Sequence, residues 1–363
     1  MKKTFLIPAL TVALLMAGCS KDDDNNTQKE DNNSSTTAAH AYLINQGNWG
    51  GNNAELSYFD PATGNMTNNY FASQNNRKLG DLAQDILQYG SQLFVTVSGS
   101  GTIEIIDPMS GKCKKTIEMG TRYPRSMAAA NGKIYVSCYY PQPSVIRIDT
   151  ATYEIEATCT LGEVNPEGLC IAGDNIYVCN SYAMTADGGY IYDSTLSVVN
   201  LSTFTETGKI VVGVNPNFVK VLSNGKLAVG YYGDYYLAPA GVAVVTLADN
   251  SVNQTEVSVA DMDVYGGNIY VLGLVYAADY SSSHAEAYKI DGTTMEKTAI
   301  LTSSLSDMTT PNAITINATN GDIYISDAQN YSANGDLYGF RQDGSLRWKA
   351  ETTMLPTHIC FIK

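Results

Sequence analysis

The stretch from Pro124 to Gly162, PRSMAAANGKIYVSCYYPQPSVIRIDTATYEIEATCTLG, decides the fold. It holds a short apolar strand, a turn at Asn131-Gly132, a β-rich run from Lys133 to Cys138 and a Tyr/Pro loop. A third strand ending in Asp149, a Thr-rich turn and a fourth strand follow. This pattern predicts a four-stranded antiparallel meander of about 40 residues, the size of a propeller blade. Because such a sheet cannot bury both its faces alone, its neighbours must be copies of it.

Copies of the second strand recur along the chain. They begin 41 to 54 residues apart, at Ala41, Leu93, Ile134, Ile176, Leu227, Ile269 and Ile323. A glycine turn precedes six of them, as a tight hairpin requires, at Gly90, Gly132, Gly173, Gly225, Gly266-Gly267 and Gly321. A proline often recurs before the first strand of a unit, at Pro124, Pro166, Pro216, Pro311 and Pro356.

The seventh unit is divided between the two ends of the chain. Residues 356–362 supply a lone first strand, whereas His40 to Tyr70 supply a second, third and fourth strand. Joining them closes the ring and leaves no open sheet edge. The sequence therefore predicts an all-β fold over residues 40–363. We expect a seven-bladed β-propeller of four-stranded antiparallel blades, in which the C-terminal strand pairs with the N-terminal blade.

The first 39 residues are interpreted as a targeting segment followed by a flexible tether. Lys2 and Lys3 precede an apolar run, Phe5 to Met16, that is too short for a typical membrane-spanning helix. The run ends in Leu-Met-Ala-Gly-Cys, which resembles the lipobox of bacterial lipoproteins and implies a signal peptide at 1–18 and lipidation of Cys19. An ordinary cleaved signal is the alternative.

Residues 19–39 are then the lipidated cysteine and an acidic, polar and flexible tether. Asp22-Asp23-Asp24 is similar to the surface-export signal of lipoproteins from gut Gram-negative anaerobes, which favours an outer-membrane, lipid-anchored protein facing the cell surface. The alternative is that these acidic residues only solvate a linker.

Composition and motifs restrict the function classes. A net charge of −14 argues against a nucleic-acid partner, which would need a basic stripe. Only three histidines occur, and no HxxxH, GxSxG or P-loop motif is present. We therefore expect no catalytic residue, metal or cofactor. The alternative is lyase or lactone hydrolase chemistry by His358, Glu167 and Arg125 at the channel mouth. The paired carboxylates Asp81 and Asp85 are interpreted as turn or capping residues.

Aromatic and Asn residues gather in loops expected on one face. In a propeller the loops joining the second and third strands emerge beside the loops that enter the first strand. Exposed rings there give a large amphipathic contact area. We therefore predict a ligand-binding face made of Asn48, Trp49, Asp81, Arg125, Tyr139, Tyr140, Glu167, Tyr182, Asn217, Tyr231, Tyr232, Tyr276, Asn312, Tyr331 and His358. The alternative is that the tyrosines only pack loop on loop.

Six cysteines remain beyond Cys19. An even number in an exported protein permits disulfides, and Cys170 and Cys179 flank one turn and are candidates for a pair. Most of the six lie in apolar strands, where a cysteine behaves as a small hydrophobe. This placement favours free, buried thiols.

The repeat and the opening of the propeller resemble a known family. The recurring Gly-x-Ile-Tyr-Val and Ile-x-Asp pattern resembles YncE-like seven-bladed propellers over residues 40–363. The opening LINQGNWGGNNAELSYFDPATG, from Leu43 to Gly64, is followed by Asn68-Asn-Tyr-Phe and Leu79-Gly-Asp. Together with the lipobox it resembles the BtuG-type surface lipoproteins, which capture vitamin B12 for a TonB-dependent transporter.

The resemblance implies a non-catalytic protein that binds cobalamin or a related corrinoid and hands it to a TonB-dependent outer-membrane transporter. The corrinoid would be a ligand rather than a cofactor, and the membrane would be reached through the lipid anchor. Cobalt ligation by His284 or His358 is an open alternative to an ordinary loop role for each. An enzyme at the channel mouth and a protein-interaction scaffold remain as competing function classes.

Overall fold

The computed structural model describes residues 40–277 and 283–363. The predictions for the signal peptide at 1–18, for lipidation of Cys19 and for the tether at 19–39 lie outside the described residues. No helix in the described part of the chain is long and apolar enough to cross a membrane.

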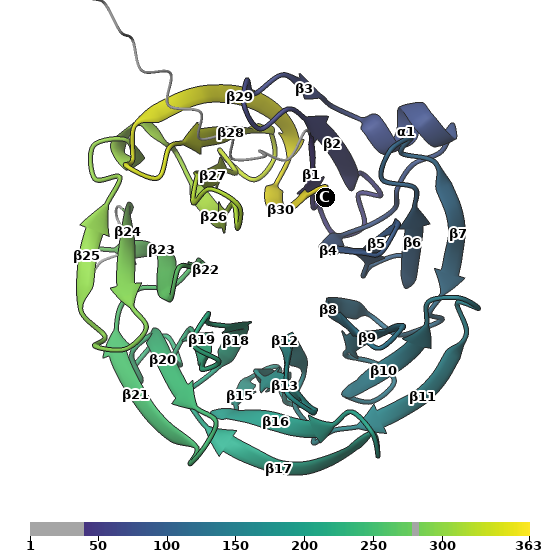
Figure 1. The fold of residues 1–363 in the computed structure, drawn as a ribbon, viewed down its shortest axis with the longest axis vertical. Coiled ribbons are helices and arrows are strands. Elements are labelled where there is room, and N and C mark those ends of the chain that lie inside the picture. Colours follow the sequence, from purple (N-terminus) through teal and green to yellow (C-terminus); the bar gives the residue numbers. More distant parts are fainter. Residues whose placement is uncertain (1–39, 278–282) are drawn as a thin grey trace, which may run out of the picture. The chain divides into compact units, whose positions relative to one another are not determined.

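Seven four-stranded antiparallel sheets stand in a ring around a central channel (Figure 1). Blade 1 holds β4 (Ala83–Tyr89), β5 (Gln92–Val97), β6 (Thr102–Ile106) and β7 (Cys113–Glu118); blade 2 holds β8 (Pro124–Ala130), β9 (Lys133–Cys138), β10 (Ser144–Asp149) and β11 (Ile155–Thr160). Blade 3 holds β12 (Pro166–Ala172), β13 (Asn175–Asn180), β16 (Thr195–Asn200) and β17 (Thr205–Val211); blade 4 holds β18 (Pro216–Val221), β19 (Leu227–Tyr231), β20 (Gly241–Thr246) and β21 (Ser251–Glu256). The predicted fold class is confirmed.

The remaining blades complete the ring. Blade 5 holds β22 (Asp261–Tyr265), β23 (Asn268–Tyr276), β24 (Ser283–Asp291) and β25 (Lys297–Ile300); blade 6 holds β26 (Pro311–Ile316), β27 (Ile323–Asp327), β28 (Asn334–Phe340) and β29 (Leu346–Met354). Blade 7 holds β30 (Pro356–Phe361), β1 (Ala41–Asn45), β2 (Glu55–Phe59) and β3 (Met66–Thr67), in that order from the channel outward. The C-terminal strand β30 thus pairs with β1, with Ala41 opposite Phe361, and the predicted closure is confirmed.

The hydrophobic core lies between the blades. Among the described residues it forms seven clusters, one at each contact between neighbouring blades. In β9, Ile134 and Val136 pack toward blade 1 while Tyr135 packs toward blade 3, because side chains alternate across a strand. Each sheet is buried on both faces, which explains why the second strands read as unbroken apolar runs.

The prolines open the inner strands. Pro124, Pro166, Pro216 and Pro311 are each the first residue of the strand that lines the channel, where a missing N–H costs no ladder bond. In each of these strands the pairing register shifts directly after the proline, as at a β-bulge. The residues that follow the prolines line the central channel: Arg125, Glu167, Asn217 and Asn312.

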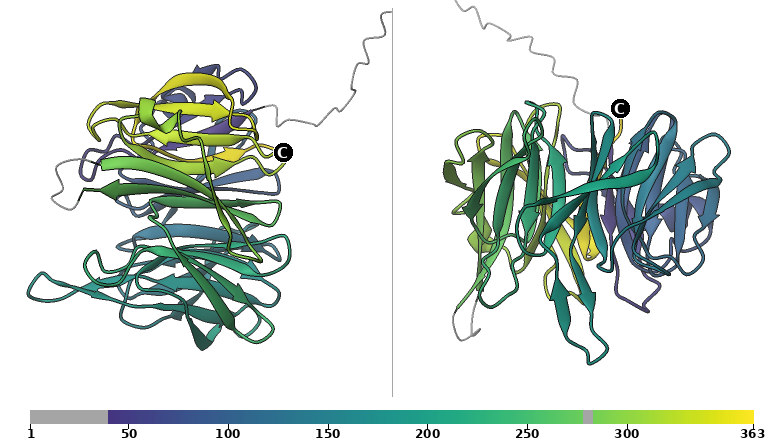
Figure 2. Two further views of the ribbon diagram at one scale, coloured as in Figure 1. Left: turned by 90° about the vertical axis from the view of Figure 1, so that its left-hand side faces the viewer. Right: turned by 90° about the horizontal axis from the view of Figure 1, so that it is seen from below.

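Three elements were not predicted from the sequence. Helix α1 (Tyr70–Asn75) packs beside β2, and the Ala72 N–H donates to the buried carboxylate of Glu55. A single 3-10 turn, η1 (Leu305–Asp307), precedes β26. A hairpin of β14 (Tyr182–Met184) and β15 (Tyr190–Tyr192) is inserted between β13 and β16 and projects from the ring (Figure 2).

The six cysteines of the propeller are free, as expected. Cys170 lies opposite Tyr177 in the ladder rather than opposite Cys179, so the proposed pair is not aligned for a bridge. Burial raises the pKa of the Cys138 and Cys170 thiols to about 12.

Candidate functional site

Exposed apolar side chains gather on one face of the ring. Of the fourteen large apolar side chains that are exposed among the described residues, ten lie where the second strand of a blade connects to the third. They are Trp49, Tyr140, Met184, Tyr190, Ile191, Tyr235, Tyr236, Leu237, Tyr276 and Tyr331. We call this surface the aromatic face. Single exposed apolar residues are ordinary on a protein surface, whereas this set is gathered on the face where the binding residues were predicted.

Many rings of the aromatic face contact one another. The Trp49 ring meets Tyr123 edge-on at 5.6 Å between centroids, and Tyr123 meets Tyr140 at 5.2 Å. A second series joins blades 2, 3 and 4 through Tyr139, Tyr182, Tyr190, Tyr192, Tyr235 and Tyr232, with neighbouring centroids 5.7 to 6.5 Å apart. The loop-on-loop packing considered above therefore occurs, and it holds the rings in place while several remain exposed.

A groove opens on this face across blades 4, 5 and 6. Its volume is about 770 Å³, within the range of small-molecule sites. The residues that line it are Tyr232, Tyr235, Tyr236, Leu237, Ala238, Pro239, Ala240, Ser258, Val259, Ala260, Leu274, Tyr276, Asn312 and Tyr331. None of these side chains is ionisable at neutral pH. We call this hollow the groove.

The central channel is the second hollow and is lined by the inner strands. Its volume is about 640 Å³, and Tyr232, Ala260 and Asn312 line both it and the groove. Unlike the groove, it carries many charged or titratable side chains: Asp85, Arg125, Glu167, Lys220, Asp261, Asp263 and His358. The two hollows therefore adjoin but differ sharply in chemistry.

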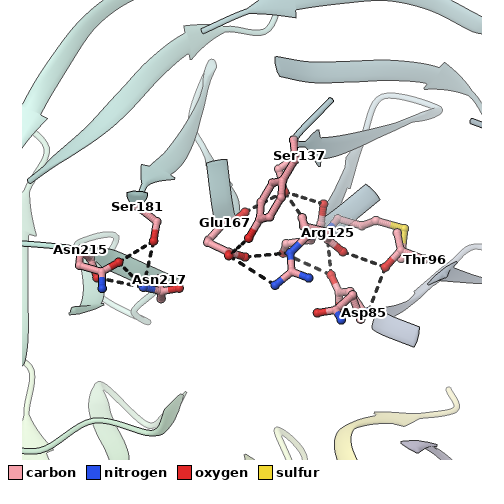
Figure 3. A network of polar contacts seen from close by, with 12 residues as sticks. Asp85, Thr96, Arg125, Ser137, Glu167, Ser181, Asn215 and Asn217 are labelled. Atoms are coloured by element: carbon pink, nitrogen blue, oxygen red, sulfur yellow. Dashed lines mark hydrogen bonds and ion pairs between the residues drawn. The ribbon is translucent and has the colours of Figure 1, made fainter. Parts of the chain in front are cut away.

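Arg125 and Glu167 form an ion pair in the channel wall (Figure 3). Arg125 Nε lies 3.1 Å from Glu167 Oε2, its Nη2 donates to Oε1 at 3.3 Å, and the Tyr139 hydroxyl donates to the same Oε1. The guanidinium also lies over the Tyr139 ring, 4.9 Å from its centroid. Both carboxylate oxygens of Glu167 therefore accept hydrogen bonds, which hold Arg125 and Tyr139 against it.

Polar contacts link each of the first two blades to the inner strand of the next blade. The Thr96 hydroxyl donates to the Arg125 carbonyl at 2.7 Å, and the Ser137 hydroxyl donates to the Glu167 carbonyl at 2.7 Å (Figure 3). Asp85 Oδ2 accepts the Met127 N–H at 2.6 Å. These side chains brace the ring and fix the shape of the channel.

The opposite wall of the channel is organised by aspartates. Asp261 Oδ2 accepts the Ile314 N–H at 2.9 Å, and Asp263 Oδ2 accepts the Ile316 N–H at 2.8 Å. Burial raises the pKa of Asp261. Lys220 Nζ lies 3.9 Å from Asp263 Oδ1, and this carboxylate raises the pKa of the Lys220 ammonium.

The histidines do not join the Arg125–Glu167 pair. His358 Nδ1 lies 3.0 Å from the Gln84 carbonyl oxygen and 3.9 Å from Asp85 Oδ1, in the channel. His284 lies on β24 beside Glu286, at 3.3 Å. In the described ranges no three His, Cys, Asp or Glu side chains meet in an arrangement that could hold a metal ion.

One predicted site residue is wrong. Tyr231 is only 5% exposed, and its ring packs in the core between blades 3 and 4. A Cβ on Gly213 would lie 2.5 Å from that ring, which shows how closely the core surrounds it. Tyr231 is the last residue of β19, whereas Tyr232 follows the strand and lines both the groove and the channel. Tyr231 therefore belongs to the scaffold.

Three other predicted residues support loops and strands. Asp81 Oδ2 accepts the Gly50 N–H at 2.8 Å and so fixes the loop that carries Trp49. Asn48 is held in that loop, where its N–H donates to Asn53 Oδ1 at 2.9 Å. The Asn217 amide nitrogen donates to the Asn215 carbonyl at 2.9 Å. Trp49, Tyr140, Tyr276 and Tyr331 lie on the aromatic face, Tyr182 and Tyr232 contact its rings, and Arg125, Glu167, Asn217, Asn312 and His358 line the channel.

Several residues of the aromatic face and the channel are absent from the predicted site: Tyr190, Tyr235, Tyr236 and Leu237 on the face, Tyr123 and Tyr192 in contact with its rings, and Asp85, Lys220, Asp261 and Asp263 in the channel. A signal existed for some of them. The run Tyr231 to Tyr236 falls in a loop joining second and third strands, and inner-strand alternation from Asp261 indicates Asp263.

Comparisons with known proteins identify the fold and no family. No protein-family model matches the chain, and no curated protein matches it. A quinonprotein alcohol dehydrogenase-like protein from Bacteroides thetaiotaomicron is similar in structure, with a TM-score of 0.64 and 11% identity over 88% of this chain and 77% of that one. The hydrazine synthase of Kuenenia stuttgartiensis has a TM-score of 0.58 and 15% identity, over 69% of this chain and 74% of that one. At these identities the likeness concerns the propeller fold alone.

Proposed function

We propose that this chain is a non-catalytic binding protein that captures a corrinoid, most simply cobalamin, on its aromatic face. It would be held at the outer membrane through lipidated Cys19, face the cell surface and pass the ligand to a TonB-dependent transporter. The proposal joins the YncE-like resemblance of the repeat and the BtuG-type resemblance of the opening segment and lipobox to the geometry of the loops.

The observation that carries the proposal is the collection of exposed rings on one face, next to a groove of about 770 Å³. A corrinoid is a large flat ring system edged with neutral amides. Tyrosine suits such a ligand, because its ring contributes apolar area and its hydroxyl both donates and accepts hydrogen bonds.

The channel supplies a second candidate function, an enzyme of the lyase or lactone hydrolase type. Its support is the Arg125–Glu167 pair near the mouth, at 3.1 Å. Against it, Glu167 is already bound by Arg125 and Tyr139, and His358 stands beside Asp85 rather than within this pair. The names of the two structural neighbours refer to enzymes, but at such low sequence identity they do not support an enzymatic activity of this chain.

Titration of the purified protein with cyanocobalamin, followed by calorimetry and by the visible absorption of the ligand, tests the proposal. We expect saturable binding with one ligand per chain and a shift of the visible bands. The absence of both heat and a spectral change at micromolar protein would contradict the function. Conversion of a lactone or uronide substrate that is lost in Glu167→Gln would favour the enzyme instead.

A further inference from the structure

We infer that the groove across blades 4, 5 and 6, and not the central channel, seats the flat ring system of the ligand, an inference that rests on the function proposed above. The ligand would then lie off the axis of the propeller. The aromatic rings on blades 2, 3 and 7 would contribute less to its binding.

The groove and the channel differ in charge. Every described side chain that lines the groove is uncharged at neutral pH, whereas the channel carries Asp85, Arg125, Glu167, Lys220, Asp261, Asp263 and His358. Placing cobalamin, which carries no net charge, over those groups would remove water from the charges without supplying a countercharge, which is costly. In the groove the same ring displaces water from aromatic and aliphatic surface, which is favourable.

Exposed apolar side chains from three blades surround the groove. Tyr236 is 92% exposed and Leu237 is 93% exposed on the blade 4 wall, and on the other walls Tyr276 is 55% exposed and Tyr331 is 47% exposed. These side chains come from loops of three different blades and line one hollow. A planar ligand in that hollow would cover apolar surface on several sides at once.

The loop that forms the blade 4 wall of the groove is held in place before any ligand binds. Asp234 Oδ1 accepts the N–H groups of Tyr236, Leu237 and Ala238 at 2.7 to 2.9 Å. Gly233 has a φ of +71°, and a Cβ there would lie 2.1 Å from the Ala238 carbonyl oxygen, so the turn requires glycine. Because the loop is already fixed, little conformational entropy is lost when a ligand binds.

The blade 6 wall is fixed in a similar way. The Tyr331 N–H donates to the Ala328 carbonyl at 2.9 Å, and Asn330 Oδ1 accepts the N–H groups of Ser332 and Ala333 at 3.0 and 2.8 Å. The floor is closed by the Ser258 hydroxyl, which donates to the Leu274 carbonyl at 2.7 Å. The walls and the floor of the groove are thus held by bonds that do not involve the ligand.

The test compares alanine variants by cyanocobalamin affinity. Tyr236→Ala and Tyr331→Ala change the groove, and each should raise Kd about tenfold, since a stacked aromatic contact is worth on the order of 1 kcal/mol or more and adds to the area lost. Tyr140→Ala and Tyr190→Ala change the aromatic face outside the groove and should raise Kd by a smaller factor. Met109→Ala, in the exposed turn between β6 and β7, and Leu346→Ala, at the exposed first residue of β29, lie away from the aromatic face and are the neutral controls.

Salt dependence supplies a second, independent readout. Binding in an uncharged groove should keep the same Kd between about 50 mM and about 500 mM salt, whereas contacts to channel charges would be screened. The inference is overturned if Tyr140→Ala or Tyr190→Ala weakens binding more than the groove variants, or if Kd rises steeply with salt. If the unaltered protein does not bind cyanocobalamin, the proposed function fails and this inference fails with it. Circular dichroism and thermal unfolding verify that each variant is folded.

Discussion

The indole N–H of Trp348 donates to the carbonyl oxygen of Pro61 at 3.0 Å and joins blade 6 to the N-terminal part of blade 7. The Trp348 ring also packs against Phe59 and Tyr324, with distances between ring centroids of 5.9 Å and 5.8 Å. A Cβ on Gly64 would lie 2.5 Å from the same ring. One side chain of β29 therefore holds the segment that follows β2 to the penultimate blade, next to the point where the two ends of the chain meet.

Replacing Trp348 should therefore destabilise the whole ring. We expect Trp348→Ala to lower the free energy of unfolding by about 2–4 kcal/mol, somewhat less than the usual cost of removing a fully buried ring, because Trp348 is half-buried. Chemical denaturation followed by circular dichroism measures this. The matched control is Trp49→Ala, because Trp49 is exposed and should change stability by less than about 0.5 kcal/mol. Equal midpoints for the two variants would rule out the role of Trp348 in closure.

The ion pair between Arg125 and Glu167 makes a second prediction. Both side chains are mostly buried, so removal of one leaves the other without its partner. A double-mutant cycle with Arg125→Ala and Glu167→Ala should give a coupling energy of about 0.5–3 kcal/mol in the free energy of unfolding. Additive effects of the two single changes would show that the pair does not brace the channel wall.

Tyr231 and Tyr232 should respond in opposite ways. Tyr231→Ala removes a ring from the core between blades 3 and 4 and should lower stability by about 3–5 kcal/mol. Tyr232→Ala should mainly weaken cyanocobalamin binding, since this ring lines the groove. Unfolding curves and ligand titrations on both variants check the contrast. A loss of affinity in a folded Tyr231→Ala protein with unchanged stability would restore Tyr231 to the site.

Tyr231 and Tyr232 also show what can be predicted from the sequence and what cannot. The blades follow from local patterns: apolar runs such as Ile134–Cys138, glycine turns such as Gly132, and prolines at the start of inner strands. The side to which a ring points at a strand end depends on a single step of the alternation, which the sequence leaves open for the run Tyr231 to Tyr236.

Tyr232, Tyr276, Asn312 and Tyr331 were predicted from their loops, but the groove itself was not, because its walls come from loops of three blades and meet only after the ring has closed. The β14–β15 hairpin was missed for a different reason. Its two strands have three residues each, and the alternation in so short a segment is indistinguishable from an irregular loop.

The thiols make a prediction about reactivity. Burial raises the pKa of Cys138 and Cys170 to about 12 and that of Cys360 to about 11. The attacking form is the thiolate, so at pH 8 these groups should be almost unreactive toward a disulfide reagent in the folded protein. Labelling should become fast in denaturant, where the pKa returns to its ordinary value near 8.5. Rapid labelling of the folded protein at Cys138 or Cys170 would contradict the packing between the blades.

The central claim is that the propeller is a scaffold for a ligand-binding aromatic face. Hydrogen exchange of the backbone amides, measured with and without saturating cyanocobalamin, tests this claim most directly. We predict slower exchange in the loops that build the groove, at 232–240, 257–260 and 327–333. We predict no change in the turns of the opposite face, at 107–112, 149–154 and 291–296. Unchanged exchange throughout, or protection only at the opposite-face turns, would contradict the account.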